Sequence, residues 1–203
     1  MPASGAPVLC LASASPRRRE LLAQIGVPCT VLVPEIDEAV LAGESAADHV
    51  VRLARAKALS VRARASGLPV LAADTIVLIG ERICGKPADA ADGIAMLLAL
   101  SGRSHQVLTA VALATGDGVS HHLSASEVRL RQLSRAECAA YWESGEPRDK
   151  AGGYAVQGRA AVFIEHLSGS YSGVMGLPLF ETAQLLDAAG LGCWHGLRPR
   201  GGA

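Results

Sequence analysis

Near its N-terminus the chain reads Val8-Leu-Cys-Leu-Ala-Ser-Ala-Ser-Pro-Arg-Arg-Arg-Glu-Leu-Leu22. The apolar run at 8–11 predicts a strand, and the leucines that follow at helical spacing predict a helix. Ser15 occupies the position of an N-cap, Pro16 suits the first helical residue, and Gly26 suits the C-terminus. We therefore expect a strand, a tight hydroxyl-rich turn and a helix in immediate succession.

The predicted helix begins with three consecutive arginines, Arg17 to Arg19. A helix N-terminus exposes unpaired N–H groups and carries a partial positive charge, so it attracts anions. Arginine is unfavourable at this end unless an anion offsets it, and its planar guanidinium matches phosphate oxygens. The turn therefore predicts a phosphate-binding site, with a solvated basic first turn as the alternative.

The composition is typical of a packed globular protein. The 203 residues are 50% hydrophobic and 19% charged, enough for one domain or two small lobes that share a core. The formal net charge is +0 and the aromatic content is 3%, which argues against a protein that binds polymeric nucleic acid. Without an internal repeat or a Pro/Ser-rich linker, we expect residues 1–203 to form a single domain, with residues 191–203 as a flexible tail.

Five dispersed cysteines form no C-x-x-C pair: Cys10, Cys29, Cys84, Cys138 and Cys193. This pattern predicts free thiols in a reducing compartment rather than a disulfide framework or a structural zinc site. Residues 1–7 do not resemble a signal peptide, and no apolar run is long enough to span a bilayer. These observations predict a cytoplasmic protein that does not bind a membrane.

The rest of the chain predicts strands that alternate with helices. The expected strands cover 29–33, 70–79, 82–84, 105–114, 119–130, 160–166 and 172–175. The expected helices cover 45–64, 89–100, 134–144 and 179–189. Thr115-Gly-Asp-Gly118 is a hairpin turn between two of the strands. The pattern favours an α/β fold, with α+β as the alternative, around a mixed sheet in two lobes with a central cleft.

Asp74 interrupts the nearly apolar strand expected at 70–79. A carboxylate in such a strand costs several kcal/mol unless it is paired, protonated or bound to a metal. A structural ion pair is one explanation. A ligand site is favoured, because ligands usually bind at strand ends in α/β sheets.

Further charged and polar residues complete the candidate site. An acidic loop offers carboxylates, one of which can join Asp74 in binding a hard divalent cation, although such a loop is often simply solvated: Glu35, Asp37 and Glu38. Three isolated lysines suit the perimeter of a phosphate site: Lys57, Lys86 and Lys150. The amide of Gln157 suits the edge of a nucleobase, with an ordinary polar loop residue as the alternative. This set predicts metal-assisted attack of water on a phosphoryl group.

Several motifs, in order along the chain, resemble the Maf family of nucleoside triphosphate pyrophosphatases. They include Ala73-Asp-Thr-Ile-Val77 and Glu146-Pro-Arg-Asp-Lys-Ala-Gly-Gly-Tyr-Ala-Val-Gln-Gly158, together with residues 11–22, 51–58, 85–87, 100–105 and 176–178. The resemblance implies hydrolysis of a nucleoside triphosphate to the monophosphate and diphosphate with a divalent metal cation, Mg or Mn. It also implies a two-lobed α/β fold of the inosine-triphosphatase type and a homodimer.

The resemblance also implies roles for individual residues. In the family, the aspartate that matches Asp74 is the proton acceptor. Six positions match residues that line the nucleotide cleft, with Glu38 as the companion of Asp74 at the metal: Ser13, Arg18, Glu38, Lys57, Lys86 and Gln157.

Three positions separate the branches of the family: Arg17, Thr75 and Gln157. The branch acting on dTTP and UTP resembles this chain at all three, whereas the branch acting on 7-methyl-GTP typically has Trp, Gln and Glu. A Gln amide can pair with both a carbonyl and an imide N–H of a pyrimidine. The resemblance therefore implies a dTTP/UTP pyrophosphatase, with canonical or modified pyrimidine nucleotides left open. The alternatives are a 7-methyl-GTP enzyme and a non-catalytic, nucleotide-responsive protein that influences septum formation or cell shape.

Overall fold

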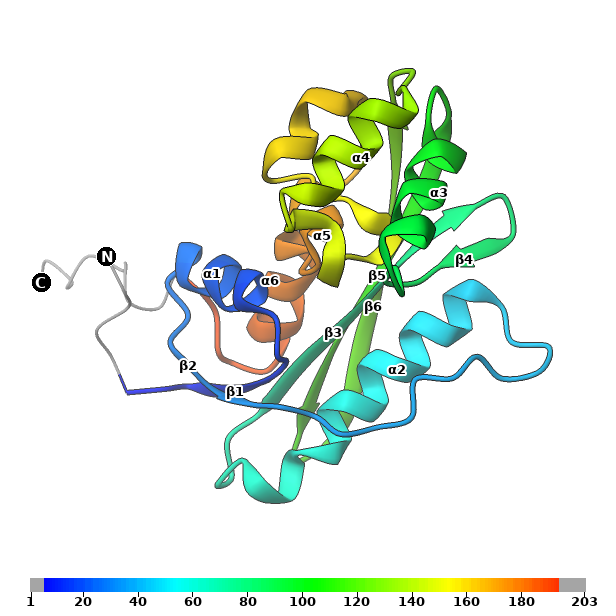
Figure 1. The fold of residues 1–203 in the computed structure, drawn as a ribbon. Coiled ribbons are helices and arrows are strands. Elements are labelled where there is room, and N and C mark those ends of the chain that lie inside the picture. The colour runs from blue at the N-terminus through cyan, green and yellow to red at the C-terminus, as the bar shows by residue number, and fades with distance from the viewer. Residues whose placement is uncertain (1–5, 194–203) are drawn as a thin grey trace, which may run out of the picture.

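A computed structural model describes residues 6–193, and a mixed sheet forms its centre (Figure 1). The strands are β1 (Leu9–Ala12), β2 (Cys29–Leu32), β3 (Val70–Ile79), β4 (Arg82–Cys84), β5 (Ser104–Thr115), β6 (Gly118–Leu130) and β7 (Ile164–Ser168). Their order across the sheet is β2-β1-β3-β5-β6-β7, and β4 pairs with β3. Strand β1 runs parallel to β2 and β3, while the other pairs are antiparallel. The mixed α/β sheet predicted from the sequence is confirmed.

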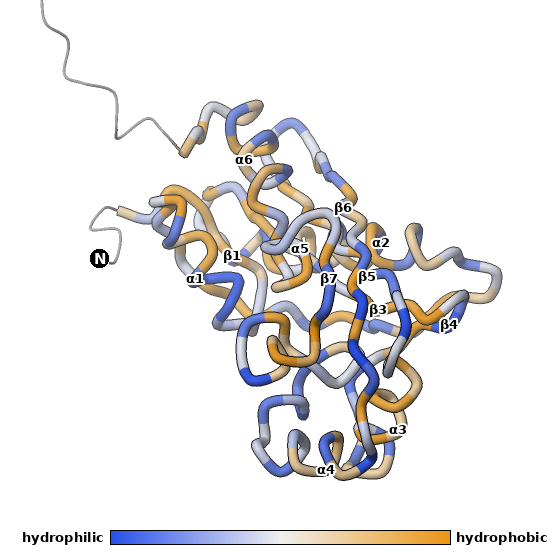
Figure 2. Tube along the Cα trace, turned by 90° about the horizontal axis from the view of Figure 1, so that it is seen from above, coloured by the Kyte–Doolittle hydropathy of each residue, from blue (hydrophilic) through white to orange (hydrophobic). Residues whose placement is uncertain are grey.

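Helices cover both faces of this sheet (Figure 1). They are α1 (Pro16–Gln24), α2 (Ala46–Ser60), α3 (Ala90–Leu100), α4 (Arg135–Glu143), α5 (Tyr171–Met175) and α6 (Leu179–Ala188). Side chains of α2 pack on one face of β3 and β5, and those of α1 and α6 pack on the other. Helices α3 and α4 form a further apolar cluster with β4 and the nearby ends of the long strands. The start of α1 is strongly hydrophilic in Figure 2 because it contains the three arginines.

The edge of β3 opposite β5 is only partly paired with other strands, and the unpaired part is where a cleft can form. Strand β1 pairs with β3 as far as Ala72, and β4 begins to pair with it at Val77. In the part of the chain that the structure describes, residues 73–76 therefore have a strand partner only on the β5 side. Successive strand residues point to opposite faces, so Asp74 faces α2 and Thr75 faces α1. A gap between strands thus presents polar side chains from both faces of the sheet.

Two of the predicted strands are wrong in whole or in part. The strand expected at 172–175 is instead the short helix α5, because Ser170 caps it by accepting a hydrogen bond from the Gly173 amide. The strand expected at 160–166 begins only at Ile164, because Arg159–Phe163 form a 3-10 helix. The backbone amide of Arg159, the first residue of that helix, donates to the Glu146 carboxylate, a contact that strand propensity does not reveal.

The tail expected at 191–203 lies mostly outside the described residues. Leu191 and Cys193, which the structure does describe, are half-buried against the cluster formed by β1, α1 and α6. The five cysteines all lie within residues 6–193 and are free, and Cys10, Cys84 and Cys138 are buried in the core. Over the same residues, no helix combines the length and the apolar character that crossing a bilayer requires. The single-domain organisation of residues 1–203 stays a prediction.

His105 is a buried titratable group in β5, with 3% of its surface exposed. Its Nε2 atom lies 2.7 Å from the Tyr154 hydroxyl, and the two rings meet edge to face. Its Nδ1 atom is buried and has no hydrogen-bond partner among the described residues. Burial lowers the pKa of His105 from 6.5 to about 4, because the charged imidazolium loses its hydration.

This pKa difference predicts a loss of stability in mild acid. Between pH 6.5 and about 4 the unfolded chain binds a proton at His105 that the folded chain does not. The free energy of unfolding therefore falls as the pH is lowered through this window, by about 3 kcal/mol in total. We expect urea unfolding at pH 7 and pH 4.5 to show a larger loss for the wild type than for His105→Gln. Equal losses in the two proteins would contradict the assignment.

Candidate active site

A cleft of about 800 Å³ opens beside the uncovered edge of β3. Its size is within the range of pockets that hold small ligands, ~300–1,000 Å³. The residues predicted from the sequence as site residues all line it: Ser13, Arg17, Arg18, Glu38, Lys57, Asp74, Thr75, Lys86 and Gln157. Lys150 lines it as well, paired with Asp149. Glu35 and Asp37, the other carboxylates of the acidic loop, are not among the lining residues. The fold thus brings together groups that lie up to 144 positions apart, from Ser13 to Gln157.

Lys57 joins two carboxylates on the α2 side of the cleft. Its Nζ atom lies 2.6 Å from Asp74 Oδ1 and 2.7 Å from Glu38 Oε1. Asp74 and Lys57 are buried, at 6% and 8% exposure, while the Glu38 side chain is 56% exposed. The ion pair explains how a carboxylate is tolerated inside an apolar strand. It also faces the cleft, so the structural explanation and the ligand-site explanation of Asp74 are compatible.

Glu38 lies among several cations. Burial by itself would raise its pKa, but the hydrogen bond and charge of Lys57, with Lys86 and Arg18 further away, lower the pKa below its ordinary value. Glu38 is therefore ionised at neutral pH. Its surroundings show that positive groups from three separate segments, α1, α2 and the loop after β4, converge on one part of the cleft.

The two carboxylates fit a divalent cation of the magnesium type. Lys57 contacts one oxygen of each carboxylate, so Asp74 Oδ2 and Glu38 Oε2 remain unused by this ammonium group. Residues 6–193 contain no cluster of three or more His, Cys, Asp or Glu side chains arranged to hold a metal. Mg²⁺ is commonly bound by one or two carboxylates together with water and substrate phosphates. This donor set suits a cation that binds with its substrate and does not suit a permanent structural metal.

Arg18 organises the opposite wall of the cleft. Its Nε donates to the Gly176 carbonyl at 2.7 Å, Nη1 to Ser13 Oγ at 3.3 Å and Nη2 to Thr75 Oγ1 at 3.3 Å. Burial lowers the pKa of Arg18, and the charge of Asp74 opposes that effect. A guanidinium that has lost hydration is stabilised by an incoming anion. The three hydrogen bonds to Gly176, Ser13 and Thr75 hold the Arg18 guanidinium in place.

The N-terminus of α1 lies beside Arg18. Ser15 is the N-cap residue, as predicted, but its side chain makes no capping hydrogen bond. Its own amide donates to Ser13 Oγ at 3.1 Å. The first N–H groups of α1 are thus available to a bound anion. Arg19 is exposed on the outer side of the helix, whereas Arg17 is half-buried at the cleft.

Thr109 does not line the cleft but supports the lining residue Thr75, a contact that the sequence did not reveal. It lies on β5, where its hydroxyl donates to the Gly173 carbonyl at 2.7 Å and lies 3.0 Å from Thr75 Oγ1. Thr75 consequently contacts both Arg18 and Thr109. A threonine within a β-strand carries no signal of this kind, because β-branched residues are common there.

The lysine loop after β4 is tied to the Gln157 side of the cleft. The Gly152 amide donates to the Gly85 carbonyl at 3.0 Å, next to Lys86. Gly152 has a φ of +71°, and a Cβ atom there would lie 3.0 Å from the Val77 methyl groups. Only glycine combines this backbone conformation with such close approach to β3.

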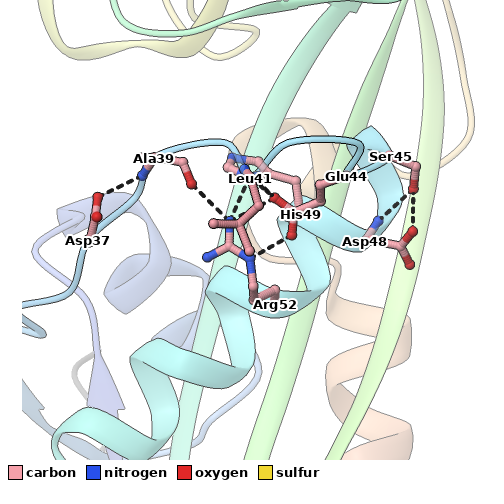
Figure 3. Close-up of polar contacts among 8 residues, drawn as sticks. All are labelled: Asp37, Ala39, Leu41, Glu44, Ser45, Asp48, His49 and Arg52. Carbon is pink, nitrogen blue, oxygen red and sulfur yellow. Dashed lines mark hydrogen bonds and ion pairs between the residues drawn. The ribbon is translucent and has the colours of Figure 1, made fainter.

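A polar cluster fastens the loop that bears Glu38 (Figure 3). Arg52 Nε donates to Glu44 Oε1 at 2.5 Å, and Nη2 donates to Glu44 Oε2 at 2.8 Å and to the Ala39 carbonyl at 2.9 Å. His49 Nδ1 lies 3.0 Å from Glu44 Oε2. The Arg52 hydrogen bond is the main reason that the pKa of Glu44 falls to about 2. Because Ala39 follows Glu38 directly, this cluster fixes the backbone next to the cleft carboxylate.

We expect Arg52→Gln to loosen this loop without unfolding the protein. Amide hydrogen exchange over residues 34–44 should become faster by roughly tenfold or more, because a charge-assisted bidentate contact is lost. Arg129→Gln, which removes the exposed Arg129–Glu165 ion pair of β6 and β7, is the matched control. Unchanged exchange over 34–44 in Arg52→Gln would show that the cluster does not hold the loop.

Comparisons with known proteins identify the family of this chain. Residues 8–189 match the Maf-like protein family. The chain is 54% identical over 195 residues to a dTTP/UTP pyrophosphatase of Saccharophagus degradans, covering 94% of this chain and 93% of the relative. It is 53% identical over 194 residues to a dTTP/UTP pyrophosphatase of Bordetella avium, covering 91% and 96%. A third protein with that name, from Methylobacillus flagellatus, is 54% identical over 183 residues, covering 89% and 92%. The chain belongs to the Maf-like protein family.

Proposed function

We propose that the protein hydrolyses dTTP and UTP to the monophosphate and diphosphate. The observation that carries this proposal is the buried, ionisable Asp74–Lys57 pair, which faces the same cleft as Arg18 and the open N-terminus of α1. One wall can bind phosphate and the other can activate water. The names of relatives that are 53–54% identical over about nine-tenths of the chain support dTTP and UTP as substrates.

In this proposal the triphosphate binds between the two walls. The α1 N-terminus and Arg18 receive phosphate oxygens, with Ser13 as a hydrogen-bonding partner. Lys57 and Lys86 neutralise further phosphate charge from the opposite side. The prior anchoring of Arg18 by Gly176, Ser13 and Thr75 reduces the ordering that binding requires.

Asp74 is the proposed general base. It accepts a proton from a water molecule, whose oxygen forms a bond to the α-phosphorus as the bond from that phosphorus to the bridging oxygen breaks. The bridging oxygen and its electron pair leave with the diphosphate. Lys57, 2.6 Å away, holds the Asp74 carboxylate in position and offsets its charge while Asp74 is ionised.

The proposal includes a divalent cation, Mg²⁺ or Mn²⁺, held by Asp74 and Glu38. When bound, such a cation neutralises charge that develops on the phosphoryl oxygens. The unused oxygens Asp74 Oδ2 and Glu38 Oε2 support this assignment.

Base recognition is assigned to Gln157, Thr75 and Arg17. Gln157 lines the cleft and is exposed, and its amide can pair with a pyrimidine carbonyl and imide N–H. Thr75 contacts Arg18 and thereby connects the base-recognition residues to the phosphate wall. Arg17 lines the cleft and helps to lower the pKa of Asp149, another residue that lines it.

The proposal extends to the state and setting of the protein. We infer a cytoplasmic homodimer that binds neither polymeric nucleic acid nor a membrane. The formal net charge of +0 and the five free cysteines support the cytoplasmic setting and the absence of a nucleic-acid partner. The homodimer rests on the family resemblance.

The role of Asp74 predicts a large loss of turnover in Asp74→Asn. Nucleotide binding should persist, while diphosphate release should fall by about a hundredfold or more, because the general base is lost. Binding is measured by calorimetry, and Asp117→Asn in the exposed β5–β6 turn serves as the control. Near-normal diphosphate release by Asp74→Asn would rule out this mechanism.

The substrate assignment predicts that specificity constants for dTTP and UTP exceed that for 7-methyl-GTP. Steady-state assays of the wild type with Mg²⁺, with Mn²⁺ and with chelator measure these constants and the metal requirement. A preference for 7-methyl-GTP would show that Gln157 does not select pyrimidines. Hydrolysis of none of these nucleotides would favour the non-catalytic, nucleotide-responsive alternative.

A further inference from the structure

Glu146 makes an unusual set of contacts outside the cleft. It begins the 3-10 helix Glu146–Asp149 after α4 and is not a lining residue. Its Oε1 accepts a hydrogen bond from the Tyr141 hydroxyl at 2.7 Å, and its Oε2 accepts one from the Arg159 amide at 3.0 Å. The Ala160 amide lies 3.4 Å from Oε1 as a further donor. One side chain therefore receives three donors, two of them from backbone that is distant in sequence.

The contacts of Glu146 lie after Gln157 in the chain, and Tyr141 adds a hydrogen bond to the backbone before it. Its hydroxyl accepts a hydrogen bond from the Ala155 amide at 3.2 Å. Ala155 and Arg159 lie two residues before and two residues after Gln157. The carboxylate–phenol pair of Glu146 and Tyr141 thus holds the backbone on both sides of the residue assigned to base recognition.

Gly158 shows that the loop and the carboxylate fit each other closely. Its backbone has φ +150° and ψ −154°, a conformation that L side chains rarely adopt. A Cβ atom at this position would lie 2.5 to 2.7 Å from the Glu146 carboxylate. The glycine next to Gln157 therefore permits the approach of Glu146 to the loop.

The charge state of the pair favours strong hydrogen bonds. Burial by itself raises the pKa of Glu146, but the Arg159 amide, the Tyr141 hydroxyl and the charge of Lys150 bring the pKa below its ordinary value. Burial and the neighbouring carboxylate raise the pKa of Tyr141. At neutral pH an ionised carboxylate thus accepts from a protonated phenol and from backbone amides, which is the stronger class of hydrogen bond.

We propose that Glu146 and Tyr141 are positioning residues for substrate specificity, which hold Gln157 in the geometry that distinguishes uracil and thymine from other bases. The inference rests on the proposed function, because it assumes that Gln157 contacts the base. An amide discriminates between bases only when its backbone is held to within about 0.5 Å of the productive position. Glu146 and Tyr141 supply that constraint from behind the loop, without touching the substrate.

The test compares specificity constants for UTP, dTTP and CTP in Glu146→Gln and Tyr141→Phe. Glu146→Gln removes the negative charge and places the N–H groups of the new side-chain amide next to backbone N–H donors, which they cannot pair with. Tyr141→Phe removes the hydroxyl that accepts the hydrogen bond from the Ala155 amide. We expect the UTP-to-CTP ratio of kcat/KM to fall by roughly tenfold in each variant, mostly through KM for UTP, with kcat within about threefold of wild type. Glu165→Gln, an exposed carboxylate on β7, is the matched control and should leave the ratio unchanged.

Combination with Gln157→Ala separates positioning from general destabilisation. Gln157→Ala alone should lower the UTP-to-CTP ratio, and Glu146→Gln added to it should lower the ratio no further, because both changes act through one contact. Tyr141→Phe provides the same comparison if Glu146→Gln does not fold. A uniform loss of kcat on all three nucleotides with an unchanged ratio would overturn the inference.

The outcomes also distinguish this inference from the proposed function. A wild-type protein that hydrolyses neither dTTP nor UTP overturns the proposed function itself. A selective wild type whose ratio is insensitive to Gln157→Ala overturns the role of Gln157. A ratio that falls in Gln157→Ala but not in Glu146→Gln or Tyr141→Phe overturns only the positioning role.

Discussion

The buried contact between Lys57 and Asp74 is the interaction on which the arrangement of the cleft depends. Strand β3 is central in the sheet, and its apolar side chains pack on both faces, so an unpaired carboxylate there would be strongly destabilising. Helix α2 supplies the compensating charge from a residue that its amphipathic face directs toward the sheet. The same contact fixes the separation between α2 and β3 at the level of the cleft, and Glu38 joins it from the loop before α2. Removal of Lys57 would leave the buried Asp74 carboxylate without its ion-pair partner, whereas removal of Asp74 would leave Lys57 paired with Glu38 alone.

The alternation of side chains along β3 places the two polar residues of this strand on opposite faces of the sheet. Asp74 points to the α2 face with Lys57, and Thr75 points to the opposite face with Arg18. Two adjacent residues thus serve a wall suited to activating water and a wall suited to binding phosphate. Both walls are accessible to one ligand because, within residues 6–193, residues 73–76 of β3 have no strand partner on the side between β1 and β4. Sheet topology, rather than an insertion or a separate lid, places the two functions side by side.

The sequence predicts the parts of the site that are chemically out of place. A carboxylate in an apolar strand and three arginines at a helix start are both conspicuous in the sequence. Asp74, Arg17 and Arg18 line the cleft, whereas Arg19 is exposed and does not. Thr109 and Glu146 carry no such signal in the sequence. A threonine is common in a strand, and the partners of Glu146 are a phenol and backbone amides whose positions depend on the whole fold. The sequence also does not reveal helix α5, which it predicts as a strand at 172–175. Its five residues are too few for periodicity, and the Ser170 cap and the left-handed Gly176 define it.

Helix α1 is left incomplete at its N-terminus. A serine at the N-cap normally stabilises a helix by about 1 kcal/mol through its side-chain hydrogen bond, and Ser15 forgoes this contact. Under the proposed function, a phosphate bound at this turn would supply the missing hydrogen-bond acceptor, so affinity for the ligand and stability of the free fold are opposed there. Within that proposal, any change that allowed Ser15 to cap α1 would stabilise the fold and weaken phosphate binding at this turn. The uncapped N-terminus of α1 is thus a case in which the proposed function requires that one local interaction remain unmade.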